Sequence, residues 1–483
     1  MGEQRGRGRT RQEKDTLGTM EVPAAALYGA QTARALANFP ISGWTLPSAF
    51  LVALARIKAA YARANAERRL LAPQLAEAIA AAAEEVAGGE HLEQFPLDVF
   101  QTGSGTSTNM NMNEVIAHLA NRRLGGDPAA HRPVHPNDHV NLGQSSNDAI
   151  PAALRIATAL AWRDTVRPAV LAVAARLERL GREHARTVTL GRTHFMDAVP
   201  TTYGRVFAAW AMRLGEAAAA CEASAGRLLA LPLGGTAVGS GIGADPRVVA
   251  RAVRILANST RLKLTMHENP AVGIAAQDAP IAHADTLAGV ARVLFGIAND
   301  IRMRASGPFG GLGELDLPAI QPGSSIMPGK VNPVIPEAVA QVAIEVEGLA
   351  SACRGAAALH QLDLSHANPL LAWNLDTMAH LLGSACDALV ERCLGGLRVN
   401  RERALALAAA SPALATALAT HIGYERAAEV AKAAEKAGIT VLEAARRLAV
   451  LPERELEQAL DLERLASATR NKSRGRTARS RWR

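Results

Sequence analysis

A long apolar stripe at helical spacing is the feature of this chain that most restricts its fold. Between residues 152 and 180, apolar side chains recur every three or four positions, opposite charged residues such as Arg155, Arg176 and Glu178. This period is typical of an amphipathic α-helix. A helix of this length buries its apolar face only against other helices, so we expect a bundle helix that is kinked near Pro168.

Four further segments repeat the pattern, at residues 206–230, 281–303, 336–359 and 370–394. Hydrophobic residues make up 49% of the chain but aromatic residues only 4%, and the apolar content is mainly alanine and leucine, which favours helices over strands. We therefore predict an all-α fold with a central bundle of long helices. The apolar stripes are wider than the bundle of one chain requires, which predicts an oligomer.

The length of 483 residues exceeds what one hydrophobic core usually supports, so two or three domains are expected. Much of the net charge of +8 lies in Arg5–Lys14 and Arg470–Arg483. We interpret residues 1–14 and 469–483 as disordered basic tails. They do not interleave aromatic residues apart from Trp482, so nucleic-acid binding is disfavoured.

The sequence gives no indication of a membrane protein or a metalloprotein. The N-terminus lacks the apolar core of a signal peptide, and no run of about 18 uncharged apolar residues occurs, which predicts a soluble cytoplasmic protein. The cysteines lack metal-site spacing and are expected to be buried thiols. They are Cys221, Cys353, Cys386 and Cys393.

The segment 323–333 combines a hydroxyl, a cation and an amide in one loop punctuated by glycine and proline. Ser324, Lys330 and Asn332 lie between residues that interrupt helices, among them Gly329 and Pro333. An ordinary surface turn is the alternative, but the apolar pair Ile326-Met327 and a lone lysine are unusual at a solvated tip. We interpret this loop as a binding site for an anion, in which Ser324 acts as a base if it is ionised.

Four other polar connections separate the predicted helices, at residues 101–114, 135–148, 191–200 and 233–241. The first two offer more hydroxyls and amides than the capping of one helix requires, and helix N-termini bind carboxylates well. In the third, His194 is placed to exchange a proton near neutral pH. The fourth lacks both a preceding strand and the GxGxxG spacing, so a dinucleotide-binding fold is disfavoured.

The motifs GSGTSTNMNMNEV, HPNDHVN with QSSND, GRTHFMDAVP, LGGTAVG and GSSIMPGKVNP resemble those of the fumarase/aspartase superfamily, in the same order. They are most similar to class II fumarases, and the resemblance runs from Glu13 to Tyr424. It implies a three-domain, all-α homotetramer with the long helices in a shared central bundle and each active site built from three subunits. The implied domains are 15–144, 145–398 and 399–468.

The resemblance also implies a reaction, the reversible anti addition of water to fumarate to give (S)-malate, a step of the tricarboxylic acid cycle, without metal or organic cofactor. Ser324 matches the base that removes a proton beside a substrate carboxylate. His194, oriented by Glu337, matches the group that handles the leaving water. The positions that match substrate-binding residues are Ser104, Thr106, Ser145, Ser146, Asn147, Thr193, Ser325, Lys330 and Asn332.

A second, accessory dicarboxylate site described for class II fumarases is matched by four residues, which we interpret as an entry or regulatory position. These are Arg132, His135, Asn137 and Asp138.

Two alternatives stay open. Aspartate ammonia-lyase forms the same kind of carbanion, and Gln321-Pro322, residues 334–337 and Thr106-Ser107-Thr108 are more similar to that enzyme. Ser104, Ser146, His135 and Gly235 favour fumarase and lie nearer the substrate loops. A non-catalytic homologue is the other alternative, but it would have no physical reason to keep an activated serine.

Three departures from the family pattern bear on specificity. Met196 and Arg205 stand where the family usually has glutamine, and residues 359–369 replace a segment of different sequence that normally packs against the site. Loss of an amide at position 196 predicts a change in the size or polarity of the accepted substrate.

Overall fold

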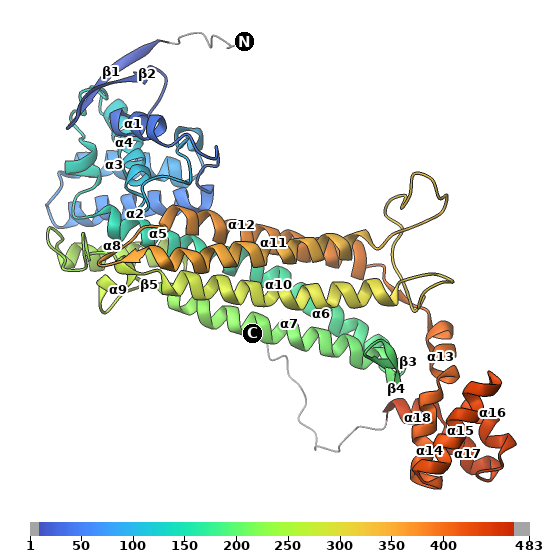
Figure 1. Ribbon diagram of the computed structural model, residues 1–483. Coiled ribbons are helices and arrows are strands. Elements are labelled where there is room, and N and C mark those ends of the chain that lie inside the picture. The colour runs from blue at the N-terminus through green and yellow to red at the C-terminus, as the bar shows by residue number, and fades with distance from the viewer. Residues whose placement is uncertain (1–8, 468–483) are drawn as a thin grey trace. The chain divides into compact units, whose positions relative to one another are not determined.

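A computed structural model describes residues 9–467, and helices dominate it (Figure 1). The prediction of an all-α fold is confirmed, because the described strands are short and form only two-stranded sheets. They pair as β1 (Thr10–Asp15) with β2 (Gly18–Pro23), β3 (Val188–Thr193) with β4 (Met196–Thr202), β5 (Ala230–Leu231) with β6 (Thr265–Met266), β7 (Leu315–Asp316) with β10 (Arg398–Val399), and β8 (His360–Gln361) with β9 (Leu364–Ser365).

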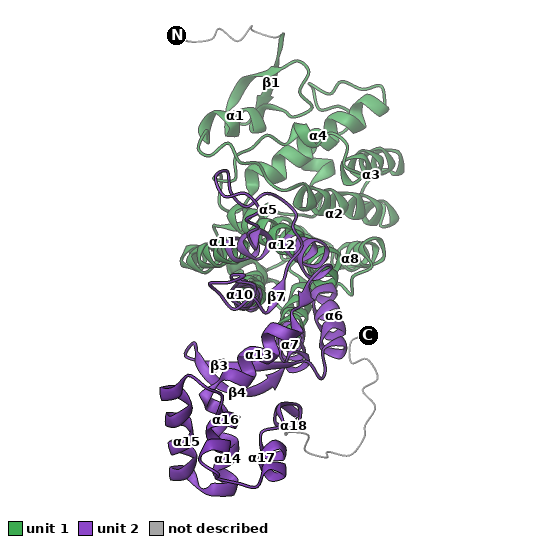
Figure 2. Ribbon diagram, turned by 90° about the vertical axis from the view of Figure 1, so that its right-hand side faces the viewer, with its two compact units in different colours: residues 1–169, 217–292, 342–384 green, residues 170–216, 293–341, 385–483 purple. Residues whose placement is uncertain are grey.

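The chain divides into two compact units (Figure 2). Unit 1 comprises residues 1–169, 217–292 and 342–384, and unit 2 comprises residues 170–216, 293–341 and 385–483. The division falls inside five long helices, which therefore contribute to both units. They are α6 (Arg167–Glu183), α7 (Tyr203–Gly226), α10 (Asp278–Arg304), α11 (Val334–Ala356) and α12 (Asn368–Leu389).

Unit 1 contains the N-terminal helices. Helix α2 packs against α3, α5 and α8, and α4 packs against α1 and α3. The core between them is rich in alanine, which allows the helices to approach closely. The bounds are α1 (Ala30–Asn38), α2 (Ser48–Glu67), α3 (Pro73–Ala87), α4 (Thr106–Arg123), α5 (Ser146–Ala161), α8 (Pro246–Thr260) and α9 (Pro270–Ala275).

Unit 2 ends in small helices that pack around a core containing Leu418, Val430, Val441 and Leu456. The β3–β4 hairpin packs against two of these helices, α13 and α18. The bounds are α13 (Arg401–Ala410), α14 (Ala415–Ile422), α15 (Tyr424–Ala437), α16 (Val441–Arg447), α17 (Glu453–Ala459) and α18 (Leu462–Ser467).

The long helices begin and end within a few residues of the predicted bounds, and the predicted irregularity near Pro168 is present. A wider, five-residue π-helical turn at Trp162–Val166 separates α5 from α6. Pro168 follows in the first turn of α6. In a regular α-helix its ring would clash with the backbone carbonyl four residues earlier, and that residue lies in the π-helical turn. The predicted segment 152–180 is therefore two helices joined by this turn.

Four expectations from the sequence are wrong. The loop 233–241 does follow a strand, because β5 ends at Leu231. Residues 10–14 are not a disordered tail, because they form β1 and pair with β2; residues 1–8 and the second tail, 469–483, lie outside the described residues. Residues 106–114 are not a connection, since α4 begins at Thr106. Residues 191–200 form most of a hairpin, β3–β4, rather than an irregular connection.

Among helices of the described chain, α10 alone meets the length and apolarity of a membrane span, and a bent pair at 401–410 and 412–422 meets them only if joined. Half of the apolar window of α10 is buried, and core helices of soluble proteins meet the same criterion. The four cysteines are buried, as predicted.

Helix α10 carries a histidine that makes stability depend on pH. Burial lowers the pKa of His283 from 6.5 to about 4, and its Nδ1 lies 2.8 Å from the hydroxyl of Ser224. The folded protein binds this proton less tightly than the unfolded chain does. Protonation of His283 therefore favours the unfolded chain. The stability that the neutral side chain contributes is fully present above pH 6.5 and is lost as the pH falls toward 4.

We expect His283→Gln to make the decline in unfolding free energy between pH 6.5 and 4 shallower, as measured by urea unfolding at a series of pH values. The exposed His421 provides the control, because His421→Gln should leave the slope unchanged. Equal slopes for His283→Gln and the unmodified protein would contradict the assignment.

Candidate active site

The first group of predicted substrate-binding residues lies where α5 begins, in unit 1. Ser145 caps the helix: its hydroxyl accepts the backbone N–H of Asn147 at 3.2 Å, and its own N–H donates to Asp148 Oδ1 at 2.9 Å. Ser146 is the first helical residue, and Asn147 Nδ2 donates to the Ala237 carbonyl at 2.8 Å. These half-buried side chains occupy a helix N-terminus, which favours a bound carboxylate.

Asp148 joins this turn to the glycine-rich loop at 233–241. Its Oδ2 accepts the backbone N–H groups of Gly234 and Thr236, at 3.1 and 2.9 Å. The side chain is completely buried, and burial raises its pKa to about 6. The glycines allow tight packing as expected, since a Cβ at Gly239 would lie 2.5 Å from the Ala271 side chain.

The second group precedes α4. Gly105 takes a left-handed conformation with φ of 80°, and a side chain there would collide with Ile150. This tight turn brings the Ser104 hydroxyl within 2.9 Å of the Thr106 hydroxyl. Ser104 is buried whereas Thr106, at the first position of α4, is exposed.

The segment that departs from the family pattern, 359–369, contacts this second group. The N–H of Asn368 donates to the Gly103 carbonyl at 3.0 Å, and a Cβ at Gly103 would overlap the His366 backbone. The altered segment forms the short hairpin β8–β9, with Leu362 at its tip at φ of 52°. Its backbone therefore helps to shape the loop that carries Ser104 and Thr106.

The accessory-site residues surround a five-residue π-helical turn, Pro136–Val140. His135 precedes it, and its Nδ1 accepts the backbone N–H of Asp138 at 3.2 Å. Asn137, Asp138 and Arg132 are exposed, while His135 is partly exposed. The structure thus places all four side chains along one short surface segment.

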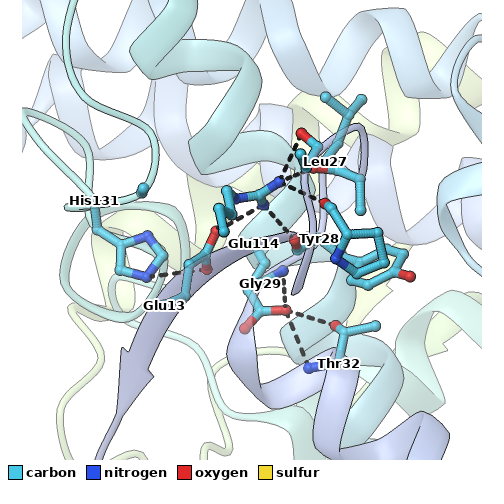
Figure 3. A network of polar contacts seen from close by, with 12 residues as sticks. Glu13, Leu27, Tyr28, Gly29, Thr32, Glu114 and His131 are labelled. Atoms are coloured by element: carbon cyan, nitrogen blue, oxygen red, sulfur yellow. Dashed lines mark hydrogen bonds and ion pairs between the residues drawn. The ribbon is translucent and has the colours of Figure 1, made fainter. Parts of the chain in front are cut away.

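A buried network anchors the N-terminal hairpin close to this segment (Figure 3). Glu114 of α4 accepts the N–H groups of Gly29, Gln31 and Thr32, and the Thr32 hydroxyl at 2.6 Å, so it caps the start of α1. On β1, the Glu13 carboxylate lies 3.9 Å from His131, and burial raises the pKa of Glu13. The sequence analysis did not identify these residues, because acidic side chains far apart in sequence carry no local signal.

The third group is the loop 323–333, in unit 2. The Ser324 hydroxyl accepts the backbone N–H groups of Ile326 and Met327 at 3.2 and 3.0 Å. The loop is closed at its base, where the N–H of Gly323 donates to the Lys330 carbonyl at 2.7 Å and Asn332 Nδ2 donates to the Gly323 carbonyl at 2.8 Å. A side chain at position 323 would overlap this closure.

Lys330 and Ser325 are exposed on the loop, and Ser324 is half-buried. A cavity of about 740 Å³ borders its C-terminal half and reaches Arg398. The loop therefore presents three groups at its surface. They are the Ser324 hydroxyl, which two N–H groups hold, the Lys330 ammonium group and the Asn332 amide, which is fixed by its hydrogen bond. This set of groups suits an anionic ligand.

The fourth group is the tip of the β3–β4 hairpin, also in unit 2. His194 and Phe195 form a two-residue turn with φ of 54° and 62°, the geometry of a tight hairpin turn. Thr193, His194 and Met196 are exposed. Among described residues, no hydrogen bond joins His194 to Glu337, which lies in the first turn of α11.

A buried glutamate holds this hairpin in place. Glu314 accepts hydrogen bonds from Thr189 Oγ1 at 3.1 Å and from the Tyr203 hydroxyl at 3.0 Å. It also pairs with Arg192 at 3.1 Å and with Arg304 at 3.3 Å, and its side chain is completely buried. The sequence analysis missed Glu314, because its partners come from three separate segments.

Comparisons with known proteins agree with the family resemblance of the motifs that carry these residues. A family model described as Lyase matches residues 18–348, and one described as Fumarase C C-terminus matches residues 414–467. The class II fumarate hydratase of Xylella fastidiosa strain Temecula1 is 46% identical over 453 residues, which cover 94% of each chain. The chain belongs to the class II fumarate hydratase family.

Solved structures support the same membership. A crystal structure of class II fumarase from Schistosoma mansoni is 34% identical, with a TM-score of 0.93, and the match covers 96% of this chain and all of that one. A fumarate lyase:delta crystallin from Brucella melitensis, bound to cobalt, is 43% identical with a TM-score of 0.91 and covers 95% of this chain and 100% of its own. The predicted family, fold and lyase class are confirmed.

Proposed function

We propose that this chain catalyses the reversible hydration of fumarate to (S)-malate. The observation that carries the proposal is the Ser324 hydroxyl, held by two backbone N–H groups on the loop that also presents Lys330 and Asn332. Family membership at 46% identity supports the choice of substrate. The reaction requires no metal or organic cofactor in this proposal.

In the dehydration direction, Ser324 removes the proton from the carbon next to one carboxylate of malate. A neutral hydroxyl is too weak a base, so its ionised form must be stabilised. The N–H groups of Ile326 and Met327 point at the Ser324 oxygen and supply that stabilisation. The positive charge of Lys330 on the same loop acts in the same direction.

Removal of the proton places negative charge on the adjacent carboxylate. Lys330 and Asn332 bind this group in the proposal, together with residues at the starts of α4 and α5. Donors that are already fixed before the reaction stabilise such charge at little reorganisation cost. The capping of Ser145 and the contact of Asn147 with Ala237 fix two of these residues. The complete proposed set is Ser104, Thr106, Ser145, Ser146, Asn147, Thr193, Ser325, Lys330 and Asn332.

His194 then gives a proton to the departing hydroxyl group, so that water leaves from the second carbon. The tight turn fixes the backbone at His194 and leaves its ring exposed. In the proposal, Glu337 orients the ring. Arg132, His135, Asn137 and Asp138 are proposed to bind a second dicarboxylate on its way to or from the site.

We propose that four copies assemble so that the loops of three subunits form each active site. Large apolar side chains are exposed on the long helices, and they include Met212 (66%), Phe295 (38%), Met303 (47%) and Ile344 (64%). Apolar surface is typical of subunit interfaces where it is contiguous, and these exposed side chains support the proposed assembly. Within this assembly, the proposed domains are 15–144, 145–398 and 399–468, and the proposed location is the cytoplasm.

Native mass spectrometry should therefore give a mass close to four times the chain mass of 50.7 kDa. Ile344→Glu should shift the distribution toward smaller species, because it places a charge in the apolar interface. The control is the exposed Leu17→Glu on the N-terminal hairpin, which should leave the mass unchanged. A monomer at micromolar concentration would contradict the assembly.

The reaction is tested by incubating fumarate with the protein in deuterated water and following the product by proton NMR. Hydration predicts malate with one deuterium, placed anti to the new hydroxyl group, as read from the three-bond coupling of the remaining protons. Fumarate that persists unchanged, or a mixture of both stereoisomers from the first turnovers, would contradict the proposal.

A further inference from the structure

A buried lysine lies beneath the start of α5 and belongs to none of the groups described above. Lys58 of α2 is completely buried. Its Nζ donates to Asn109 Oδ1 at 2.8 Å and to Asn141 Oδ1 at 2.9 Å. A lysine this deep in a core is rare unless its polar end has specific partners.

The two asparagines pass this contact on to the substrate-binding turn. Asn109 Nδ2 donates to the Ser146 hydroxyl at 3.0 Å and to Asn141 Oδ1 at 3.2 Å. Asn141 Nδ2 donates to the carbonyl of Gln144, the residue before the Ser145 cap, at 3.1 Å. Two hydrogen bonds thus connect Lys58 to Ser146 through Asn109. Two others connect it through Asn141 to Gln144, the residue before the Ser145 cap.

Lys58 helps to fix the orientation of each asparagine amide, together with the bonds that Asn141 Oδ1 accepts from Asn109 and Asn113. An ammonium or amine group donates to the carbonyl oxygens, so the NH₂ groups of both asparagines must face away from it. Those NH₂ groups are the ones that reach Ser146 and Gln144. Without Lys58, the Oδ1 atoms of Asn109 and Asn141 lose their charged donor, and only the bonds from neighbouring amides hold these two side chains.

The chemistry of the buried charges agrees with this arrangement. Burial lowers the pKa of Lys58 to about 7, and the negative charge of Asp148, in the first turn of α5, opposes this shift. Asp148 holds the other side of the same turn through Gly234 and Thr236. Two buried ionisable groups therefore hold the turn 145–147, Lys58 through Asn109 and Asn141 and Asp148 through its own bond to Ser145.

We infer that Lys58 is a positioning residue for substrate binding, which acts through Asn109 and Asn141 to fix Ser146 and the Ser145 cap at the N-terminus of α5. This inference rests on the proposed function, because it assigns Lys58 to the binding of a dicarboxylate. Lys58 itself does not touch the substrate in this account.

The test measures the affinity for succinate, an unreactive dicarboxylate, by calorimetry, and the KM and kcat for malate. Lys58→Met keeps the side chain as far as Cε and removes only the terminal nitrogen. It should weaken succinate binding and raise KM about 10-fold or more, the effect of losing hydrogen bonds from a charged group, with a smaller change in kcat. Asn109→Ala cuts the route to Ser146 without altering Lys58 and should act in the same direction, about 5-fold.

Arg155→Met is the matched control. Arg155 is equally buried in unit 1, but its guanidinium donates to the carbonyls of Arg227 and Ala230. Its replacement should lower stability and leave succinate affinity unchanged. If Lys58→Met and Asn109→Ala behave like Arg155→Met, with lower stability and unaltered affinity, Lys58 is only structural and the inference is wrong.

A double-mutant cycle with Ser146→Ala tests the route itself. If Lys58 acts through Asn109 and Ser146, Lys58→Met should weaken succinate binding less in the Ser146→Ala background than in the unmodified protein, and the remaining effect passes through Asn141. Fully multiplicative effects would contradict the route through Asn109.

Crystal structures separate this inference from the proposed function. Even in a protein without fumarate turnover, the crystal structure of Lys58→Met should show the Asn109 side chain displaced, with its amide beyond hydrogen-bond distance of the Ser146 hydroxyl. Unchanged positions of both side chains would overturn the inference. Absence of turnover in the unmodified protein would overturn only the proposed function.

Discussion

Ser324→Ala is expected to lower kcat for fumarate hydration about 10²- to 10⁴-fold, the usual contribution of a positioned general base. The substitution removes the oxygen that accepts the N–H groups of Ile326 and Met327. The loop keeps its closure through Gly323, Lys330 and Asn332, which does not involve the Ser324 side chain. The unfolding transition and succinate affinity should therefore change little.

Ser411→Ala supplies a control with matching local geometry. The Ser411 hydroxyl accepts the backbone N–H of Ala413, two residues ahead, as that of Ser324 does with Ile326. Its loss should cost about 1 kcal/mol of stability as a cap and leave kcat unaltered. Turnover by Ser324→Ala within about 10-fold of the unmodified protein would contradict the assignment of the base.

Glu314→Ala is expected to lower the free energy of unfolding by about 3–5 kcal/mol, the usual effect of removing one partner from a buried ion pair. It leaves Arg192 and Arg304 without their carboxylate and leaves Tyr203 without its acceptor. Because Arg192 lies in β3, two residues before His194, the hairpin tip should also lose its fixed position. We expect kcat to fall together with stability.

Urea unfolding, followed by circular dichroism, measures the free energy of unfolding. Steady-state kinetics measures kcat. Glu463→Ala is the matched control in unit 2, because Glu463 also pairs with an arginine, Arg186, but both side chains are largely exposed. Exposed pairs contribute little, so no change in the transition is expected. Equal effects of the two substitutions would contradict the role given to Glu314.

The sequence predicted the long helices well, because each carries an apolar stripe that repeats many times. The irregularity near Pro168 was also predicted, because proline disrupts a helix locally. The β3–β4 hairpin was not, although its turn is only two residues long. His194 and Phe195 take left-handed conformations that residues of their types rarely adopt, so the turn carried no glycine or asparagine signal.

In the candidate site too, only features with a local sequence pattern could be predicted. Ser324, Lys330 and Asn332 share one loop, and the cap at Ser145 lies beside its helix, so both were visible as local patterns. Lys58 and Glu314 were not, because their partners come from segments that only the fold brings together. Within a helix pattern, a single charged residue on an apolar face is indistinguishable from one that reaches solvent.

The substrate is tested most directly by comparing malate with aspartate, the substrate of the alternative that the sequence left open at Gln321 and residues 334–337. The decisive measurement is the rate at which the purified, unmodified protein forms fumarate, followed by its ultraviolet absorbance, from malate and, separately, from aspartate. We expect formation of fumarate from malate and none above background from aspartate. Formation of fumarate from aspartate alone would contradict the proposal.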